Sequence, residues 1–434
     1  MTKYYLAIDI GASSGRHIVG YLSEDKIVTE EIYRFPNGVL EVDGHLVWDI
    51  EKILFHVKEG IKKTLSIYSN LESMSIDTWG VDYVLMNGNK EILPCYAYRD
   101  KRTEKLISEV HSIIPYGELY RTNGVAFQSF NTIYQFYADK VMGRLDKADS
   151  FLMIPEYLMF KLTGKKVHEY TNASTTALLD GKTKTYSEII IKRLGFNEKL
   201  FGEIKKPGFV LGGFTEEVKN EVGGNITCIL CPTHDTASAA EGIIIDDNAP
   251  YISSGTWSLL GIKTKDLICN SLAMNANYSN ELGPYYVRFQ KNIMGLWIVQ
   301  GLSKQMEMDF SKMVELATTS HYEHIFDVND QVFLSSLDMR TEIIDWFKNN
   351  NITPPTADND IINSVFVSLA YSYKVALEEL ESIIGISYDK LYIVGGGAKN
   401  KYLNELTEKY TAHKVIALPI EATAIGNLKF QMEN

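Results

Sequence analysis

The chain has 434 residues, of which 45% are hydrophobic and 23% charged, and it carries a formal net charge of −12. This length exceeds a single hydrophobic core and predicts two domains. The negative charge disfavours nucleic acid and anionic membranes as partners. No apolar run approaches the ~20 residues that cross a membrane, and the apolar start, too short for a signal peptide, ends at Asp9, so we expect a cytoplasmic protein.

The first forty residues contain a predicted β-hairpin. Residues 4–10 and 16–22 are β-rich, and the Gly/Ser stretch 11–15 between them predicts a tight turn. Glycines let backbone N–H groups approach a phosphate closely, serines add hydroxyl donors, and Asp9 at the strand end is suited to a hydrated Mg²⁺. The turn lacks the Gly-Lys-Ser/Thr of a P-loop and the spacing of a dinucleotide fingerprint. Both of these motifs are therefore excluded, and a Gly/Ser hairpin taken alone usually binds nothing.

A second group of polar residues follows a predicted strand at 73–76. Asp77, Gly80 and Asp82 come directly after it, at the end of a strand where open α/β sheets place their ligands. The alternative reading is a turn with one hydrogen-bonded aspartate. Residues 104–178 are predicted to be mostly helical and to decorate the first domain.

The stretch 226–240 carries the candidate catalytic group. An apolar run at 226–230 predicts a buried strand, Pro232 ends it, and the polar cluster around Asp235 opens an Ala-rich helix. A helix N-terminus favours an ionised carboxylate, so Asp235 is expected to be available as a proton acceptor at neutral pH. The alternative is that Asp235 is only the N-cap of the helix.

The second half of the sequence repeats the pattern of the first. The chain crosses from Gly242 to Pro250, where residues 246–248 read as a surface turn between domains, and this predicts domains at 1–243 and 244–434. Residues 250–262 again form strand, small Gly-containing turn and strand. Two such hairpins predict two related domains that bind a polyphosphate from both sides.

Three further features fall in the second half. Residues 291–297 are predicted to open a helix that carries Gln300, with Asn292 at its start facing the cleft. Apolar positions spaced by threes and fours predict a long helix over 361–384. A strand then runs into the triple glycine 395–397, where the absence of side chains leaves backbone open to a flat ring or a ribose.

Seven motifs in consistent order make the chain, from Met1 to about Gln431, similar to the FGGY family of carbohydrate kinases, and within it to the branch that phosphorylates L-rhamnulose. The resemblance implies an α/β, actin-like ATPase fold of two RNase H-like domains with the active site between them. It also implies ATP-dependent phosphorylation of the 1-hydroxyl of L-rhamnulose with Mg²⁺. The motifs occupy residues 9–16, 77–82, 98–100, 234–238, 253–258, 291–297 and 394–397.

The same resemblance assigns roles to individual residues. Asp235 matches the base that takes the proton of the sugar hydroxyl, and Asp9 acts on the metal through water. The sugar contacts are matched by Gly80, His234, Asp235, Thr236 and Asn292. The phosphate and nucleotide contacts are matched by Ala12, Ser13, Ser14, Gly15, Arg16, Thr256, Gln300 and Gly396.

The end of the sequence departs from the family pattern. After residues 421–427 family members usually continue with several more elements, whereas this sequence ends at Asn434. The second domain is therefore expected to be shortened at its C-terminus. We expect apolar surface around the strand 391–394 to be exposed or covered by a partner chain.

Two alternative functions remain open from the sequence. A kinase of L-fuculose, a pentulose or another polyol would share the phosphate motifs and differ only around Gly80, His234 and Asn292. An actin-like ATPase or a sugar-binding module would bind ATP without phosphoryl transfer. The expected partners are a small sugar and ATP, with the chain a monomer or a homodimer.

Overall fold

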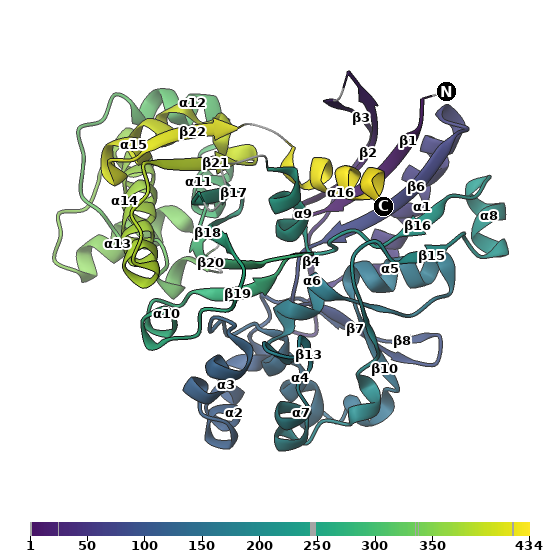
Figure 1. Ribbon diagram of the computed structural model, residues 1–434. Helices are drawn as coiled ribbons and strands as arrows, with labels where there is room; N and C mark the ends of the chain where they lie inside the picture. The colour runs from purple at the N-terminus through teal and green to yellow at the C-terminus, as the bar shows by residue number, and fades with distance from the viewer. Residues whose placement is uncertain (1, 25, 244–248, 335, 337, 419–420) are drawn as a thin grey trace.

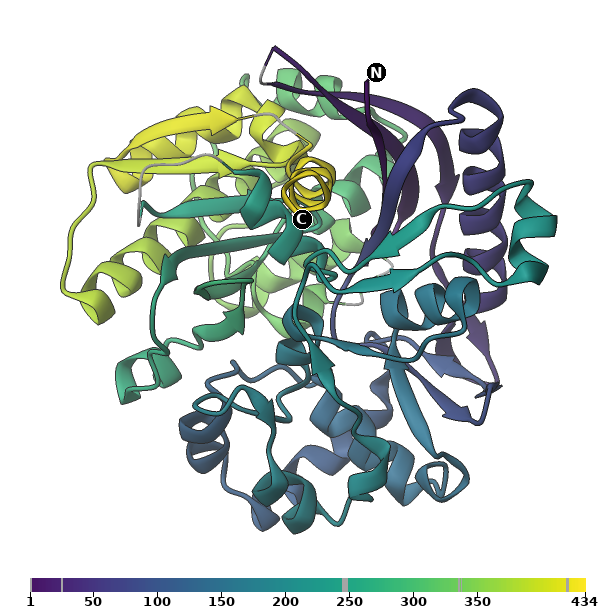
Figure 2. The ribbon, with the colours of Figure 1, turned by 45° about the vertical axis from the view of Figure 1, so that its right-hand side comes forward.

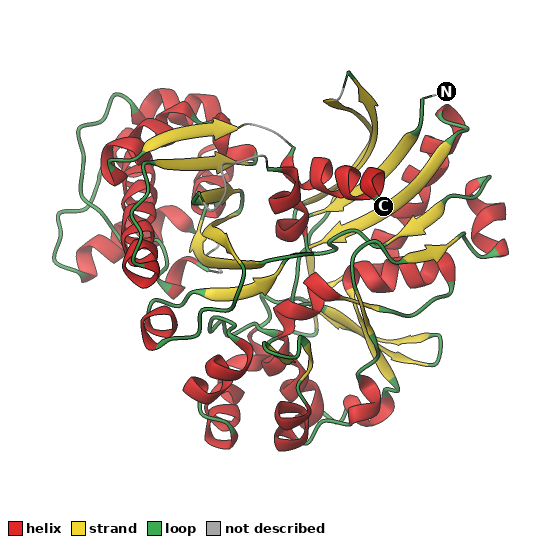
Figure 3. Ribbon diagram, in the orientation of Figure 1, coloured by secondary structure: helices red, strands yellow, loops and turns green. Residues whose placement is uncertain are grey.

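The computed structural model describes residues 2–24, 26–243, 249–334, 336, 338–418 and 421–434. Two six-stranded sheets form its framework, and helices pack around both (Figures 1 and 3). The first sheet has the order β15-β16-β6-β1-β2-β3 and is built from Tyr4–Ile10 (β1), Ser14–Ser23 (β2), Lys26–Pro36 (β3), Leu71–Thr78 (β6), Val210–Gly212 (β15) and Thr227–Ile229 (β16). The second has the order β19-β20-β18-β17-β21-β22 and is built from Tyr251–Ser254 (β17), Trp257–Thr264 (β18), Ser279–Leu282 (β19), Val287–Met294 (β20), Lys390–Val394 (β21) and Lys414–Leu418 (β22).

Both sheets have the same central arrangement. In the first, β1 pairs antiparallel with β2 and parallel with β6. In the second, β17 pairs antiparallel with β18 and parallel with β21. The two predicted hairpins are therefore confirmed, and the internal repetition extends from the hairpins to the strands beside them.

The helices carry their apolar faces into these sheets. The helix α1, Ile50–Ile67, begins at Asp49, whose side chain accepts from the Lys52 N–H at 2.9 Å. The long helix α14, Asp358–Ile384, matches the predicted one and ends at Gly385, which has φ +74°. The helices nearest the cleft are Asp235–Gly242 (α9), Trp297–Met306 (α11) and Ala422–Glu433 (α16).

One predicted element is wrong. Residues 287–294 form strand β20 instead of opening a helix, and α11 begins only at Trp297. The strand pairs with β18 on one side and β19 on the other. Because both edges of its backbone are hydrogen-bonded within the sheet, pairing with distant strands outweighs the local helical pattern. Asn292 therefore lies on a strand.

The helices α9 and α16 cross in direct backbone contact. A Cβ placed on Gly426 of α16 would lie 1.7 Å from the Ser238 carbonyl oxygen, and one on Gly242 of α9 would lie 2.0 Å from the Ala422 carbonyl oxygen. Only glycine permits this approach. Figure 2 shows α16 nearly end-on between the two sheets.

Helix α16 also packs against the first sheet. Ala424 and Leu428 form a small buried cluster with Ala7 and Ile18 of β1 and β2. The Gln431 amide donates to the Leu6 carbonyl at 3.1 Å. The last helix of the chain is therefore shared between the two halves of the molecule.

The expected exposure of the strand at 391–394 is not found. Leu391 and Val394 are fully buried, because α14 and its neighbours cover one face of the second sheet and a cluster containing Tyr251 and Ala422 covers the other. None of the described helices is long and apolar enough to cross a membrane.

Smaller elements complete the chain, and those between residues 107 and 200 form much of the lower block of Figure 1. The short strands are Val39–Val42 (β4), His45–Trp48 (β5), Tyr83–Asn87 (β7), Lys90–Ile92 (β8), Cys95–Tyr96 (β9), Ser150–Met153 (β10), His168–Glu169 (β11), Leu179–Asp180 (β12), Thr185–Tyr186 (β13) and Ile204–Lys205 (β14). The remaining α-helices are Ile107–Ile113 (α2), Tyr116–Asn123 (α3), Thr132–Val141 (α4), Ile154–Thr163 (α5), Tyr170–Ala173 (α6), Glu188–Leu194 (α7), Glu216–Val222 (α8), Ser271–Asn275 (α10), Phe310–Ala317 (α12), Met339–Asn349 (α13) and Lys401–Thr411 (α15).

The helix crossing generates a stability prediction. Gly426→Ala places a methyl group against the Ser238 carbonyl, so it forces the helices apart and lowers the free energy of unfolding by about 1–3 kcal/mol. Gly117→Ala in α3 is the matched control, since its Cβ would meet nothing closer than 3.5 Å and alanine favours a helix. Urea denaturation measures both. Equal free energies of unfolding for the two variants would contradict the close backbone contact between α9 and α16.

Candidate active site

A cavity of about 340 Å³ lies between the two sheets. The first half contributes the turn after β1, the end of β6 and the start of α9, and the second contributes the β17–β18 turn, strand β20 and the glycines after β21. Ten of the site residues expected from the sequence line it: Ala12, Ser13, Arg16, Gly80, His234, Asp235, Thr236, Thr256, Asn292 and Gly396. Asp9, Ser14, Gly15 and Gln300 are not among the lining residues.

Asp235 is the first residue of α9, one position after the N-cap. The N-cap position belongs to His234, whose side chain makes no capping hydrogen bond. The preceding loop is fixed to the end of β6, where the Thr78 N–H donates to the Thr233 carbonyl at 2.9 Å. The reading of Asp235 as an ordinary N-cap is therefore wrong, because its carboxylate faces the cavity.

The electrostatic environment of Asp235 also differs from the one expected. Its pKa is raised to about 6, mainly by burial and also by the nearby Asp9 charge, while the charges of His234 and Arg288 and a hydrogen bond from the Thr236 N–H oppose the rise. From the sequence, the only effect expected on Asp235 was that of the helix N-terminus, which favours the ionised carboxylate. Desolvation outweighs it, so the carboxylate has a pKa near neutrality, which suits a group that must accept a proton and later release it.

Two more carboxylates lie behind Asp235. Asp9 and Asp77 are register partners on β1 and β6. Asp77 is fully buried, and burial together with Asp9 raises its pKa well above the usual value. One of its oxygens accepts from the Asn427 amide of α16 at 2.5 Å, and the other has no hydrogen-bond partner.

This arrangement fits a hydrated divalent cation. Mg²⁺ is usually held by one or two carboxylates, waters and phosphate oxygens. Asp9 supplies a carboxylate next to the cavity, and the unpaired buried oxygen of Asp77 lies beside it as a further possible acceptor. Within the described ranges no three His, Cys, Asp or Glu residues gather to bind a metal directly, so the cation would be held through water and the ligand's phosphates.

Arg16 neutralises part of this charge. Its guanidinium donates to Asp9 at 2.6 Å, and it also pairs with Glu421, which immediately precedes α16. The turn before it is closed by the Gly11 N–H, which donates to the Ser14 carbonyl at 2.9 Å. The first hairpin thus presents backbone and a cation to the cavity.

The opposite wall is built from the second hairpin and the triple glycine. The Gly255 N–H donates to the Trp257 carbonyl at 2.9 Å, which closes the turn carrying Thr256. A Cβ on Gly397 would lie 2.0 Å from the Ser254 hydroxyl, so this glycine is required for packing. A Cβ on Gly396 would meet nothing within 4 Å, so this residue leaves open space in the cavity wall.

The exit of β6 forms the floor beside Asp235. A Cβ on Gly80 would lie 2.9 Å from the Thr175 side chain and 3.2 Å from His234 Nε2. Val81 has φ +65°, a strained conformation for a branched residue that typically persists at functional sites. Its N–H donates to the Thr175 hydroxyl at 3.1 Å, which holds the strained turn in place.

Asp82 has a structural role. Its carboxylate accepts from the indoles of Trp48 and Trp79 at 2.6 and 3.0 Å and from the Gln135 amide at 2.9 Å. It is fully buried and does not line the cavity. For this residue the alternative of a hydrogen-bonded aspartate in a turn is correct.

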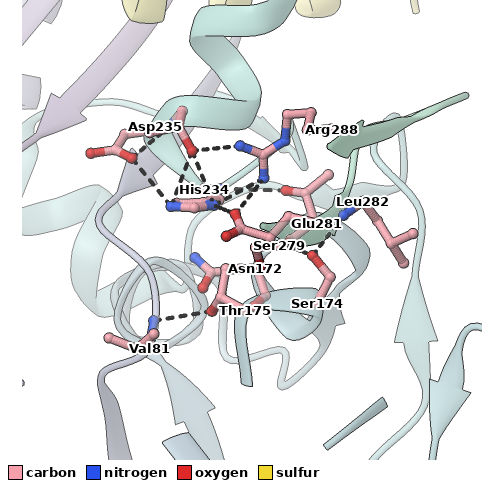
Figure 4. Close-up of polar contacts among 12 residues, drawn as sticks. Val81, Asn172, Ser174, Thr175, His234, Asp235, Ser279, Glu281, Leu282 and Arg288 are labelled. Carbon is pink, nitrogen blue, oxygen red and sulfur yellow. Dashed lines mark hydrogen bonds and ion pairs between the residues drawn. The ribbon is translucent and has the colours of Figure 1, made fainter. Parts of the chain in front are cut away.

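Sequence reasoning missed two charged residues at the site. Glu281 on β19 and Arg288 on β20 are register partners, and Arg288 Nη2 donates to Glu281 Oε2 at 3.1 Å. Figure 4 shows this pair beside His234 and Asp235. The two residues lie seven positions apart on either side of a reverse turn. The sequence could have indicated their contact only if residues 279–282 and 287–290 had been recognised as a hairpin.

Comparisons with known proteins place the chain in a family. Residues 4–242 match the N-terminal domain of the FGGY family of carbohydrate kinases, and residues 250–433 match its C-terminal domain. A rhamnulokinase of Oceanobacillus iheyensis is 42% identical over 100% of this chain and 93% of that protein. A rhamnulokinase of Bacillus subtilis is 39% identical over 99% of this chain and 89% of that protein.

Solved structures agree on the fold. A gluconate kinase from Lactobacillus acidophilus superposes with a TM-score of 0.80 at 15% identity, covering 100% of this chain and 89% of that one. A glycerol kinase from Plasmodium falciparum with ADP gives 0.76 at 16% identity, covering 99% and 89%. The expected actin-like ATPase fold is confirmed. With both domain models matched along nearly its whole length, the chain belongs to the FGGY family of carbohydrate kinases.

Proposed function

We propose that this carbohydrate kinase is a rhamnulokinase, which transfers the γ-phosphoryl group of ATP to the 1-hydroxyl of L-rhamnulose and forms L-rhamnulose 1-phosphate. The observation that carries the proposal is similarity to proteins named rhamnulokinase at 35–42% identity over the full chain. ATP and Mg²⁺ are the cosubstrate and metal of the reaction.

The proposal assigns each part of the cavity a role. Asp235 is the base, and the sugar is bound by Gly80, His234, Thr236 and Asn292. The phosphates lie against Ala12, Ser13, Ser14, Gly15, Arg16 and Thr256, the nucleotide against Gln300 and Gly396, and Asp9 holds the metal's water. We assign residues 1–243 to the sugar and phosphate domain and 244–434 to the nucleotide domain.

The chemistry follows from these roles. Asp235 accepts the proton of the 1-hydroxyl, the freed oxygen attacks the γ-phosphorus, and the bond to the β-phosphate oxygen breaks to release ADP. Phosphoryl transfer depends mainly on positioning and charge neutralisation. Bound Mg²⁺ supplies neutralisation of the phosphate charge. Arg16 and the backbone of the two hairpin turns supply the rest from the protein.

We further propose that the enzyme acts in the cytoplasm as a monomer or homodimer, without nucleic acid or membrane partners. The formal net charge of −12 supports the lack of nucleic acid and membrane partners, because nucleic acid and anionic membrane surfaces repel negative charge. Size-exclusion chromatography with light scattering measures the oligomeric state.

A substrate panel tests the function. ADP release is measured with L-rhamnulose, L-fuculose, a pentulose and glycerol. We expect the highest kcat/KM for L-rhamnulose. A higher value for another sugar would assign the enzyme to a different kinase of the same fold, and ATP turnover unaffected by every sugar would instead support an ATPase.

Removing the base should separate binding from chemistry. Asp235→Asn is expected to retain ATP and sugar binding and to lower kcat by about 10²–10⁴-fold, the usual contribution of a general base. Asp358→Asn is the matched control, because Asp358 is likewise the first residue of a helix but lies outside the cavity. Near-wild-type turnover of Asp235→Asn would remove this residue from the mechanism.

The pKa of Asp235 predicts the pH dependence. Because burial raises this pKa to about 6, the carboxylate is protonated and inactive below that value and ionised above it. We expect kcat at saturating L-rhamnulose to rise through a midpoint near pH 6 and to level off on the alkaline side. The residual activity of Asp235→Asn should lack this step. A wild-type midpoint at the ordinary aspartate value of about 4 would contradict the burial of the base.

A further inference from the structure

Arg288 is a fully buried cation at the boundary between the two halves of the molecule. It lies on β20 of the second sheet and has no exposed surface. Its Nη1 donates to the Thr236 hydroxyl at 2.5 Å, and its Nη2 lies 3.1 Å from His234 Nδ1. The two residues on either side of Asp235 are therefore both hydrogen-bonding partners of Arg288. Figure 4 shows Arg288 beside His234.

Glu281 keeps this arginine in place. Its Oε2 accepts from Arg288 Nη2 at 3.1 Å and lies 3.3 Å from His234 Nδ1. The neighbouring His234 and Arg288 lower the pKa of Glu281 to about 2 despite its burial, so it is ionised at every relevant pH. A buried ion pair of this kind adds little to stability on balance, because removing both charges from water is costly. Its presence beside the base therefore points to a role in the site.

We propose that Arg288, anchored by Glu281, is a positioning residue for phosphoryl transfer: it fixes His234 and Thr236 and thereby orients the Asp235 carboxylate toward the sugar hydroxyl. The inference rests on the proposed function, since it deepens the role given to Asp235. Arg288 does not touch the reacting atoms. It acts through the two neighbours of the base.

The strand carrying Arg288 is held against the first half of the molecule. The Leu282 N–H donates to the Ser174 hydroxyl at 2.9 Å. Leu282 and Val287 share a buried cluster with Tyr170 and Ala173 of α6. The β19–β20 hairpin is therefore fixed on both sides, which gives Arg288 a defined position relative to Asp235.

The same strand continues into the cavity. Arg288 and Asn292 are four residues apart on β20 and lie on one face of the sheet. Asn292 lines the cavity, and its buried side-chain oxygen has no hydrogen-bond partner. Positioning of the base and a sugar contact therefore come from one rigid strand.

The charges around Asp235 allow a role of Arg288 in proton transfer to be distinguished from a purely structural role. The charged groups that act on Asp235 are its neighbour His234 and, from other elements, Asp9, Asp77 and Arg288. Arg16 pairs with Asp9, and Glu281 pairs with His234 and Arg288. Among the described groups whose charge acts on Asp235, Arg288 is a permanent cation. Without the positive charge of Arg288, the negative charge of the nearby carboxylates is less compensated. Removing Arg288 should therefore affect proton transfer to Asp235 as well as the position of its carboxylate.

The test compares Arg288→Met, Arg288→Lys and Glu281→Gln with wild type, using whichever sugar wild type phosphorylates fastest. Arg288→Met should lower kcat about 10–100-fold, leave the KM for ATP within about twofold, and move the acidic limb of the kcat profile to higher pH. Arg288→Lys should return the limb toward wild type while kcat stays reduced, because lysine lacks the forked donor. Glu281→Gln should lower kcat with an unchanged KM for ATP.

Arg102→Met is the matched control. Arg102 forms another buried ion pair, with Asp139 at 2.9 Å, and does not line the cavity. It should lower the melting temperature without moving the acidic limb or kcat per folded molecule. An unmoved limb and wild-type kcat in Arg288→Met, or the same changes in Arg102→Met, would overturn the inference. If Arg288→Met does not fold, a wild-type kcat in both Arg288→Lys and Glu281→Gln would overturn it. Wild-type turnover of L-rhamnulose reports the proposed function separately.

Discussion

The backbone contact between α9 and α16 is the constraint on which the rest of the site depends. Gly242 and Gly426 allow the two helices to touch, and no other residue type would fit there. The contact brings the start of α9, with Asp235, close to both sheets. It also presents Asn427 of α16 to the buried Asp77 on β6. One helix crossing thus links Asp235, the buried Asp77 and the cavity-lining residues at the start of α16.

The raised pKa values of the carboxylates in and near the cavity result from burial that few positive charges offset. Burial raises the pKa of both Asp82 and Asp235 to about 6. Asp82 is enclosed by indole and amide donors and only holds the fold together. Asp235 has its carboxylate at the cavity and arginine-held neighbours on either side. Similar pKa shifts therefore accompany different roles, and exposure to the cavity distinguishes them.

The sequence correctly predicted the structural elements that depend on local patterns. Both hairpins, the helix over 361–384 and the triple glycine at 395–397 depend on turn residues and periodicity within one short segment, and the structure contains all of them. The strand containing Asn292 was mistaken for the start of a helix, because only its pairing with distant strands defines it. Arg288 was missed for the same reason, since its partners come from another strand and another domain.

The central claim is that Asp235 takes the proton from the 1-hydroxyl of the sugar. The most direct measurement is a crystal structure of the enzyme with L-rhamnulose and ADP. We expect the sugar O1 within hydrogen-bond reach of the Asp235 carboxylate, about 2.6–3.2 Å, and facing the two hairpin turns. A sugar bound with O1 directed away from Asp235, or with another side chain in that position, would contradict it.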